Sequence, residues 1–240
     1  MTGELLAIHA ELEAMHAWRG WVWQRGADPF EIVVGAILVQ NTAWTNVERA
    51  LANLQAAGAL SFEAMDALGA EELEQLVYPS GQFRQKARKL RAFLDIAKAH
   101  GGLDGLFALP GPVLRETLLA TWGIGPETAD CIVLFAAGQP SFVIDTYTKR
   151  IFSRLGAGPG EAASYAAWQG YFESNLPRDA ELWAAYHALI VLHAKHLCRK
   201  REPLCDHCTL ATRCAFVENG LNRQGDETPT TGTPRFPGGV

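Results

Sequence analysis

The chain reads as a succession of helices, because apolar residues recur at intervals of three and four along most of its 240 residues. The run 29–39 is almost wholly apolar, which predicts a helix buried on most sides, and a polar break follows it. Further helices are predicted over 82–99, 160–174 and 179–197. Strand-like patterning is confined to the short segment 142–144. The sequence therefore predicts an all-α protein.

The stretch 121–156 predicts a hairpin, a helix, a short extended link and a second helix. Gly123 and Gly125 permit a positive φ or a close backbone approach, and Pro126 suits the first position of a helix. The backbone N–H groups at such a turn can hold a phosphate. Asp145 directly precedes the second helix, in the position of its N-cap.

Four of the five cysteines lie close together near the end of the chain, with spacings of six, two and five residues. They are Cys198, Cys205, Cys208 and Cys214. An intracellular protein does not normally rely on two disulfides in so short a loop, so these thiolates predict a metal site. The residues alone allow zinc or an iron–sulfur cluster, although zinc ribbons usually show two Cys-x-x-Cys knuckles and this loop has one. Cys131 stands apart and is expected to be a small buried hydrophobe.

The formal net charge is −5 and the isoelectric point is about 5.8, values that are unusual for a nucleic-acid-binding protein. Basic residues nevertheless gather at 84–91 and 195–201. Each cluster either neutralises phosphates or forms a solvated helix face. The N-terminus does not resemble a signal peptide, and no apolar run is long enough to span a bilayer. We therefore expect a cytoplasmic monomer that has no membrane partner.

The segments LATWGIGPETAD (119–130) and FVIDTYTKRIF (142–152) together resemble the hairpin and catalytic-aspartate signature of the helix-hairpin-helix DNA glycosylases, the superfamily of endonuclease III. The resemblance extends from about Pro29 to Cys214 and implies an all-α fold of two lobes. The expected parts are a six-helix domain with the hairpin at 26–138, a composite helical domain from 1–25 and 139–218, and a disordered tail at 219–240.

The resemblance implies that double-stranded DNA containing a damaged base lies between the lobes, with the target nucleotide flipped out of the duplex. Asp145 would then stabilise the oxocarbenium character of the sugar and activate a nucleophile. The alternative is an ordinary N-cap, which stabilises a helix by about 1 kcal/mol. Gln40 matches the position of a glutamine that fills the gap in the base stack; alternatively, it is a polar residue at a helix end.

Glu127 departs from the pattern of the bifunctional family members. These carry a lysine at this position, and its amine forms a Schiff base that permits strand cleavage. A carboxylate cannot form an imine, so the chain is expected to be monofunctional, with water as the nucleophile, or to have lost ordinary activity. One interpretation of Glu127 is a negative charge that stabilises the first turn of its helix. The other is that Glu127 and Asp145 share a cleft and raise each other's pKa, so that one carboxyl group stays protonated. Lys149, one turn beyond Asp145, is the alternative amine.

The cysteine spacing matches the iron–sulfur loop of endonuclease III and of its adenine-mismatch relatives, which implies a [4Fe–4S] cluster. Such a cluster would present a basic loop to the DNA backbone, and the resemblance adds Gly123, Gly125 and Lys149 as further DNA contacts. The basic loop residues are Arg199, Lys200 and Arg201.

The segments GIGPETAD and QNTAW look closer to the 3-methyladenine glycosylase branch, in which an aromatic box can select alkylated purines by stacking. Trp21 and Trp44 are the expected base-pocket residues, with Trp18 and Trp23 as further candidates. The alternative for each tryptophan is packing in the core or between the lobes.

The leading expectation is a base-excision-repair DNA N-glycosylase without lyase activity, associated with the nucleoid if the source is bacterial. One alternative is a lesion-binding protein with little or no catalysis. Another is an endonuclease III-type glycosylase and AP lyase that uses another amine. Release of a free base from a damaged oligonucleotide separates an active glycosylase from a lesion-binding protein.

Overall fold

The computed structural model describes residues 2–16 and 28–225. Within these ranges the chain is helical, which confirms the predicted fold class, and the segment 142–144 is extended without pairing to another strand. None of the described helices is long and apolar enough to cross a membrane.

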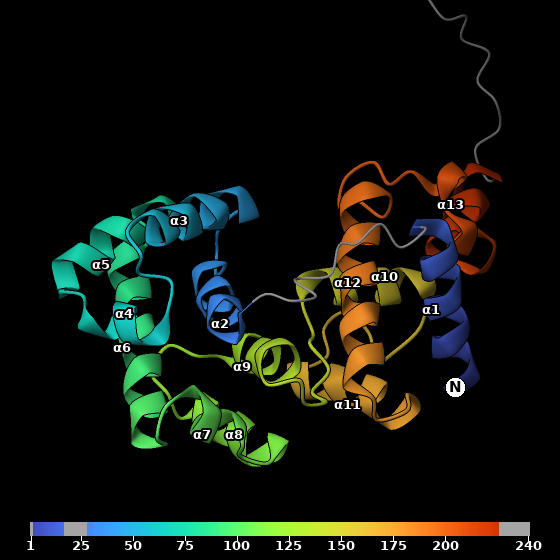
Figure 1. Ribbon diagram of the computed structural model, residues 1–240. Coiled ribbons are helices and arrows are strands. Elements are labelled where there is room, and N and C mark those ends of the chain that lie inside the picture. The colour runs from blue at the N-terminus through green and yellow to red at the C-terminus, as the bar shows by residue number, and fades with distance from the viewer. Residues whose placement is uncertain (1, 17–27, 226–240) are drawn as a thin grey trace, which may run out of the picture.

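The helices of the described residues are shown in Figure 1. Their bounds are α1 (Thr2–His16), α2 (Pro29–Leu38), α3 (Trp44–Ala56), α4 (Phe62–Ala67), α5 (Ala70–Val77), α6 (Phe83–Ala99), α7 (Leu103–Phe107), α8 (Gly111–Leu119), α9 (Pro126–Cys131), α10 (Thr146–Leu155), α11 (Tyr165–Asn175), α12 (Ala180–His196) and α13 (Ala215–Gly225).

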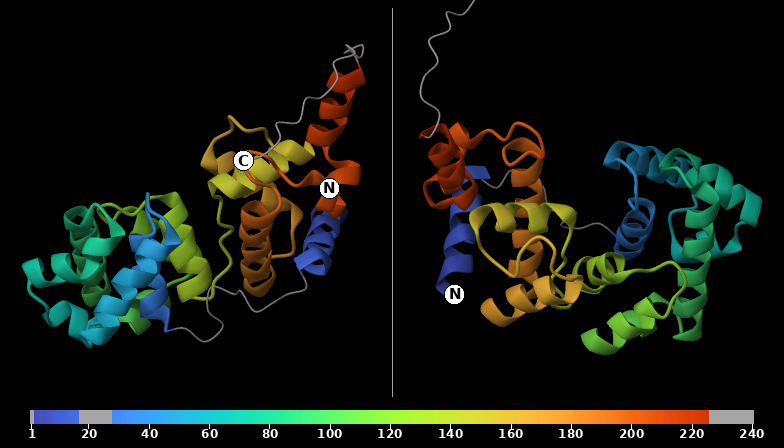
Figure 2. Two further views of the ribbon diagram at one scale, coloured as in Figure 1. Left: turned by 90° about the horizontal axis from the view of Figure 1, so that it is seen from above. Right: turned by 180° about the vertical axis from the view of Figure 1, so that it is seen from behind.

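The helices form two groups, seen from three directions in Figures 1 and 2. Helices α2 to α9 lie on one side, and α1 lies on the other side with α10 to α13. Helix α1 packs against α11 and α12, although most of the chain separates them in sequence. The buried apolar residues of both groups belong to one connected core. The domain boundary at 138/139 stays a prediction.

Local chemistry explains where helix α2 begins and how the chain turns after it. Asp28 caps α2, because its carboxylate accepts a hydrogen bond of 2.8 Å from the backbone N–H of Phe30. After α2 the chain turns at Asn41, whose φ is 55°, a value that asparagine tolerates better than most residues. Gln40 therefore lies in the turn between α2 and α3.

The helix predicted after the hairpin contains a π-helical segment. Helix α9 ends at Cys131, and residues Ile132–Ala136 continue it with wider turns. Here the backbone N–H of Ala137 donates to the carbonyl of Ile132 at 3.0 Å, five residues back. The apolar spacing is compatible with both kinds of turn, so the sequence pattern cannot distinguish them.

Two side chains of the basic cluster 84–91 fit neither of the predicted alternatives, phosphate binding or a solvated helix face. Lys86 is only 1% exposed, and its ammonium donates to the carbonyls of Leu38 and Ser80, so it ties α6 to the end of α2. Burial lowers the pKa of Lys86 to about 8. Arg91 donates to the carbonyls of Asp66 and Leu68. Charge alone does not reveal which basic residues pair with buried carbonyls.

The predicted start of the disordered tail also differs from the structure. Helix α13 continues through Gly225, so disorder does not begin at residue 219. The remainder of the predicted tail, 226–240, lies outside the described residues.

Candidate active site

A cavity of about 340 Å³ lies between the two groups of helices. A neighbouring hollow of about 610 Å³ shares Val39, Glu127 and Cys131 with it and continues along the hairpin to Gln40, Gly123 and Gly125. We call the two together the groove. Its first part is large enough to enclose a small ring system. The residues lining the 340 Å³ cavity are Val39, Thr42, Ala43, Trp44, Glu127, Cys131, Phe135, Asp145, Tyr147, His187, Ala188, Val191 and Lys195.

Asp145 lines this cavity and is half-buried. As the sequence predicts, it is the N-cap of α10: its Oδ1 accepts hydrogen bonds from the backbone N–H of Thr148 at 2.7 Å and from the Thr148 hydroxyl at 2.8 Å. No described residue donates a hydrogen bond to Oδ2. One carboxylate oxygen therefore fixes the side chain, while the other stays available to a molecule in the groove.

Glu127 lies in the first turn of α9 and lines both parts of the groove. Glu127 is exposed to solvent through the groove. Residues of both helix groups that line the same cavity nevertheless bury part of its carboxyl group. This burial, and secondly the negative charge of Asp145, raise the pKa of Glu127 to about 7. The position that would hold a lysine in bifunctional relatives therefore carries a carboxyl group that readily takes up a proton near neutral pH.

Gln40 is half-buried in the groove, and its amide is fully engaged. Its Nε2 donates to the Thr128 hydroxyl at 2.9 Å and to the carbonyl of Gly123 at 3.4 Å. Its Oε1 accepts a hydrogen bond from the ammonium of Lys89. The side chain is thus docked against the hairpin, and these bonds must break before it can enter a base stack.

The two hairpin glycines have different roles. Gly123 has a φ of 81°, and a Cβ there would lie 2.6 Å from the Lys89 side chain, so this position requires glycine. Gly125 has a φ of −93° and open space beside its Cα, so neither backbone conformation nor crowding by the described protein requires it. The space beside Gly125 leaves room for a ligand to approach the backbone.

The structure does not bring Lys149 together with the groove residues. Its ammonium donates a hydrogen bond of 2.9 Å to the carbonyl of Ala163. A different lysine, Lys195 on α12, lines the cavity that contains Asp145. Sequence reasoning placed Lys195 with the basic loop, because helical periodicity does not show which end of α12 faces the groove.

Aromatic side chains form much of the cavity wall. Trp44 lies there, as the sequence predicts, with Phe135 and Tyr147. The second expected pocket residue, Trp21, lies outside the described residues, as do Trp18 and Trp23.

His187 is a cavity residue that the sequence analysis missed. Its Nδ1 is buried without a hydrogen-bond partner among the described residues. Burial lowers the pKa of His187, an effect partly opposed by the charge of Asp145, so the ring is neutral at physiological pH. Apolar residues surround it along α12, where a histidine gives no distinct sequence signal.

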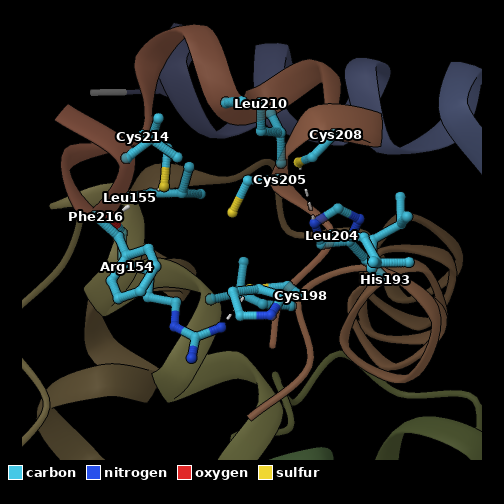
Figure 3. A pocket seen from close by; sticks show the side chains of 15 residues that line it. Arg154, Leu155, His193, Cys198, Leu204, Cys205, Cys208, Leu210, Cys214 and Phe216 are labelled. Carbon is cyan, nitrogen blue, oxygen red and sulfur yellow. Dashed lines mark hydrogen bonds between the residues drawn. The ribbon is translucent and has the colours of Figure 1, made fainter. Parts of the chain in front are cut away.

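The four clustered cysteines surround a single cavity beside α10 and α12 (Figure 3). All four are free thiols, and burial raises the pKa of Cys205 and Cys208. Arg154 donates to the sulfur of Cys198 at 3.2 Å, and the Nε2 of His193 lies 3.6 Å from the sulfur of Cys208. Cys131 is buried in the groove, away from this loop.

Among the described side chains, no three of histidine, cysteine, aspartate and glutamate lie close enough together to share one metal ion.

The basic residues of the cysteine loop are exposed, and the loop backbone is fastened to α10. Arg154 donates to the carbonyls of Arg199 at 2.8 Å and Lys200 at 3.1 Å. Arg150 donates to the carbonyl of Cys198 at 3.0 Å. The side chains of Arg199, Lys200 and Arg201 therefore extend from an anchored loop.

Comparisons with known proteins agree with this arrangement. Residues 34–171 match the family described as HhH-GPD superfamily base excision DNA repair protein. A candidate DNA repair glycosylase of Methanocaldococcus jannaschii is 42% identical over 195 residues, which cover 80% of this chain and 88% of that protein. Endonuclease III of Thermotoga maritima is 28% identical over 190 residues, which cover 79% of this chain and 84% of that protein.

Solved structures show the same fold. A non-covalent complex of endonuclease III with DNA has a TM-score of 0.76 at 22% identity, covering 92% of this chain and 99% of that one. The H. pylori 3-methyladenine DNA glycosylase bound to 1,N6-ethenoadenine has a TM-score of 0.69 at 26% identity, covering 80% and 97%.

The matched region contains the hairpin, Glu127 and Asp145, and it spans more than half of the chain. The chain therefore belongs to the HhH-GPD superfamily of base excision DNA repair proteins, and it is a DNA glycosylase of the endonuclease III family, an enzyme that hydrolyses N-glycosyl bonds.

Proposed function

We propose that this glycosylase is monofunctional and removes a damaged base from double-stranded DNA with water as the nucleophile. The observation that carries the proposal is the pair of carboxyl groups, Asp145 and Glu127, that line one cavity between the two helix groups. A flipped nucleotide would place its sugar beside Asp145 and its base among Trp44, Phe135 and Tyr147.

In the proposed reaction, the bond between C1′ of the sugar and the base nitrogen breaks. The Asp145 carboxylate stabilises the positive charge that develops on the sugar, and its Oδ2 accepts a proton from the attacking water. The water oxygen then bonds to C1′. Glu127, protonated below its raised pKa of about 7, donates a proton to the departing base.

We further propose that the hairpin and the cysteine loop hold the DNA backbone on either side of this cavity. The open space beside Gly125 lets a phosphate approach the backbone N–H groups of the hairpin. Arg199, Lys200 and Arg201 would neutralise phosphates from the anchored loop, and Gln40 would leave its hairpin contacts to fill the gap in the stack.

We propose a [4Fe–4S] cluster as the group that Cys198, Cys205, Cys208 and Cys214 hold. When bound, it supplies four iron–thiolate bonds that cross-link the loop to the end of α12. The donor set fits, because four free thiols surround one cavity and Arg154 is placed to offset thiolate charge.

A second candidate activity is strand cleavage through another amine. Lys195 favours it, because this lysine lines the cavity that contains Asp145. An amine there would form a Schiff base only if it lost its proton and reached C1′ of the sugar.

The first prediction concerns Asp145→Asn. The amide keeps a side-chain oxygen that can cap α10 but loses the negative charge, so base release should fall at least roughly a hundredfold. Single-turnover assays on a panel of duplexes with single lesions would measure the rate, and binding assays should show nearly unchanged affinity for DNA. Unchanged turnover in Asp145→Asn would assign the chemistry to another group.

The second prediction is a pH dependence set by Glu127. Because its pKa is raised to about 7, Glu127 is protonated below that pH and ionises above it. Donation to the leaving base should therefore weaken, and the single-turnover rate should fall, as the pH rises through about 7. Glu127→Gln does not titrate and should remove this fall. If the wild-type rate does not decline across this pH range, Glu127 is not the proton donor, and its role is limited to stabilising the first turn of α9.

The third prediction tests monofunctionality. Borohydride should trap no covalent complex between the wild-type protein and DNA that contains a lesion, and base loss should proceed without nicking. A trapped complex in the wild type that disappears in Lys195→Gln would establish the lyase alternative. Lys149→Gln is the matched control, since the Lys149 ammonium is engaged by the carbonyl of Ala163.

The fourth prediction concerns the cysteine loop. The purified protein should be brown and should contain about four irons per chain. Cys208→Ala should lose the iron and destabilise the loop, whereas Cys131→Ala should retain it, because Cys131 lies in the groove. A colourless protein that contains one zinc per chain would replace the cluster with a zinc site.

A further inference from the structure

The segment 141–145, which we call the strap, connects the hairpin side of the protein to the N-terminus of α10. It has no regular secondary structure and no neighbouring strand among the described residues, so its buried backbone groups require other partners. Side chains supply them. The N–H of Phe142 donates to Glu173 at 2.9 Å, and the carbonyl of Phe142 accepts from Gln169 at 3.0 Å. The N–H of Ile144 donates to the Tyr165 hydroxyl at 3.3 Å.

The three partners form one stripe on helix α11. Tyr165, Gln169 and Glu173 are four residues apart in sequence, which places them on the same face of the helix. This stripe takes the place of a neighbouring strand along the strap. The apolar side chains of the strap are also buried, and the ring of Phe142 stacks on Phe172 of α11 with a centroid separation of 4.2 Å.

Asp130 joins this arrangement to the hairpin helix. Its side chain is fully buried, and a buried carboxylate is costly unless it is paired. Arg115 of α8 donates to both of its oxygens, at 2.6 and 3.1 Å. The Tyr165 hydroxyl donates to Oδ2 at 2.7 Å, and the Ser141 hydroxyl donates to Oδ1. The Asp130 carboxylate therefore holds α8, α9, α11 and the strap together.

This network connects the two elements that carry the groove carboxyl groups. Glu127 precedes Asp130 by one turn on α9, and Asp145 is the last residue of the strap that Tyr165 and Ser141 hold. A shift of the strap would therefore change the separation between the two carboxyl groups. Misplacement of a reacting group by about 1 Å can lower an enzymatic rate by two orders of magnitude.

We propose that Asp130 and Tyr165 are positioning residues that hold Asp145 at a fixed distance from Glu127. Both act through the strap. Asp130 is fully buried, and although Tyr165 lines the hairpin end of the groove, its hydroxyl is engaged by Asp130 and Ile144. The proposal rests on the function assigned above to Asp145, and it adds the element that orients this residue.

The test uses the full-length protein and the substitution Tyr165→Phe. This change keeps the ring but removes the hydroxyl that accepts from Ile144 and donates to Asp130. At saturating DNA the single-turnover rate should fall roughly tenfold, while the affinity for DNA stays unchanged. Amide hydrogen exchange at Ile144 should accelerate. Tyr171→Phe, on the same helix, is the matched control and should leave both measurements unchanged. Ser141→Ala is a milder second variant that should show a smaller effect in the same direction.

A double-mutant cycle separates positioning from general destabilisation. If Tyr165 acts through Asp145, Tyr165→Phe should not lower the residual rate of Asp145→Asn any further. An equal fractional loss in both backgrounds would overturn the proposal. The proposal would also be overturned if Tyr165→Phe released base at the wild-type rate while Asp145→Asn was impaired. That outcome would leave the proposed function of Asp145 unaffected. If the wild-type protein releases no base from any lesion, the proposed function fails instead. Unchanged exchange at Ile144 would then overturn the strap arrangement as well.

Discussion

The N-cap bond of Asp145 is the interaction on which the arrangement of the site depends. One carboxylate oxygen caps α10, and no described residue donates a hydrogen bond to the other oxygen of this cavity-lining side chain. Helix α10 then fastens the cysteine loop through Arg150 and Arg154. A single short helix therefore connects the groove carboxylate to the exposed basic loop, so the two cannot move independently without breaking these hydrogen bonds.

The electrostatics of the groove follow from the presence of Glu127 at the hairpin. A lysine at this position would place a positive charge beside Asp145, whereas Glu127 places a second carboxyl group there. Burial between the helix groups raises the pKa of Glu127 to about 7, and the negative charge of Asp145 adds to this shift. Glu127 can therefore act as a proton donor near neutral pH, which is the role that the proposed mechanism gives it.

Much of this arrangement could be predicted from the sequence. The hairpin, the capping position of Asp145 and the helical fold follow from glycine, proline and apolar spacing, because these features act within a few residues. The burial of Lys86 and the hydrogen bond of Lys149 to a backbone carbonyl could not be predicted. Their partners are carbonyls on other elements, and a lysine has the same sequence signature whether its ammonium meets water or a buried oxygen.

The sequence by itself determined the all-helical architecture, the resemblance to the family and some of the groups that line the groove, among them Asp145, Glu127 and Trp44. Only the tertiary structure decided which residues meet there, placing Lys195 and His187 in the cavity and joining Asp130 to Tyr165. The physical reason is the separation in sequence over which each interaction acts. Helix formation and capping depend on neighbours within one or two turns, whereas burial and the pairing of charges depend on segments brought together by folding.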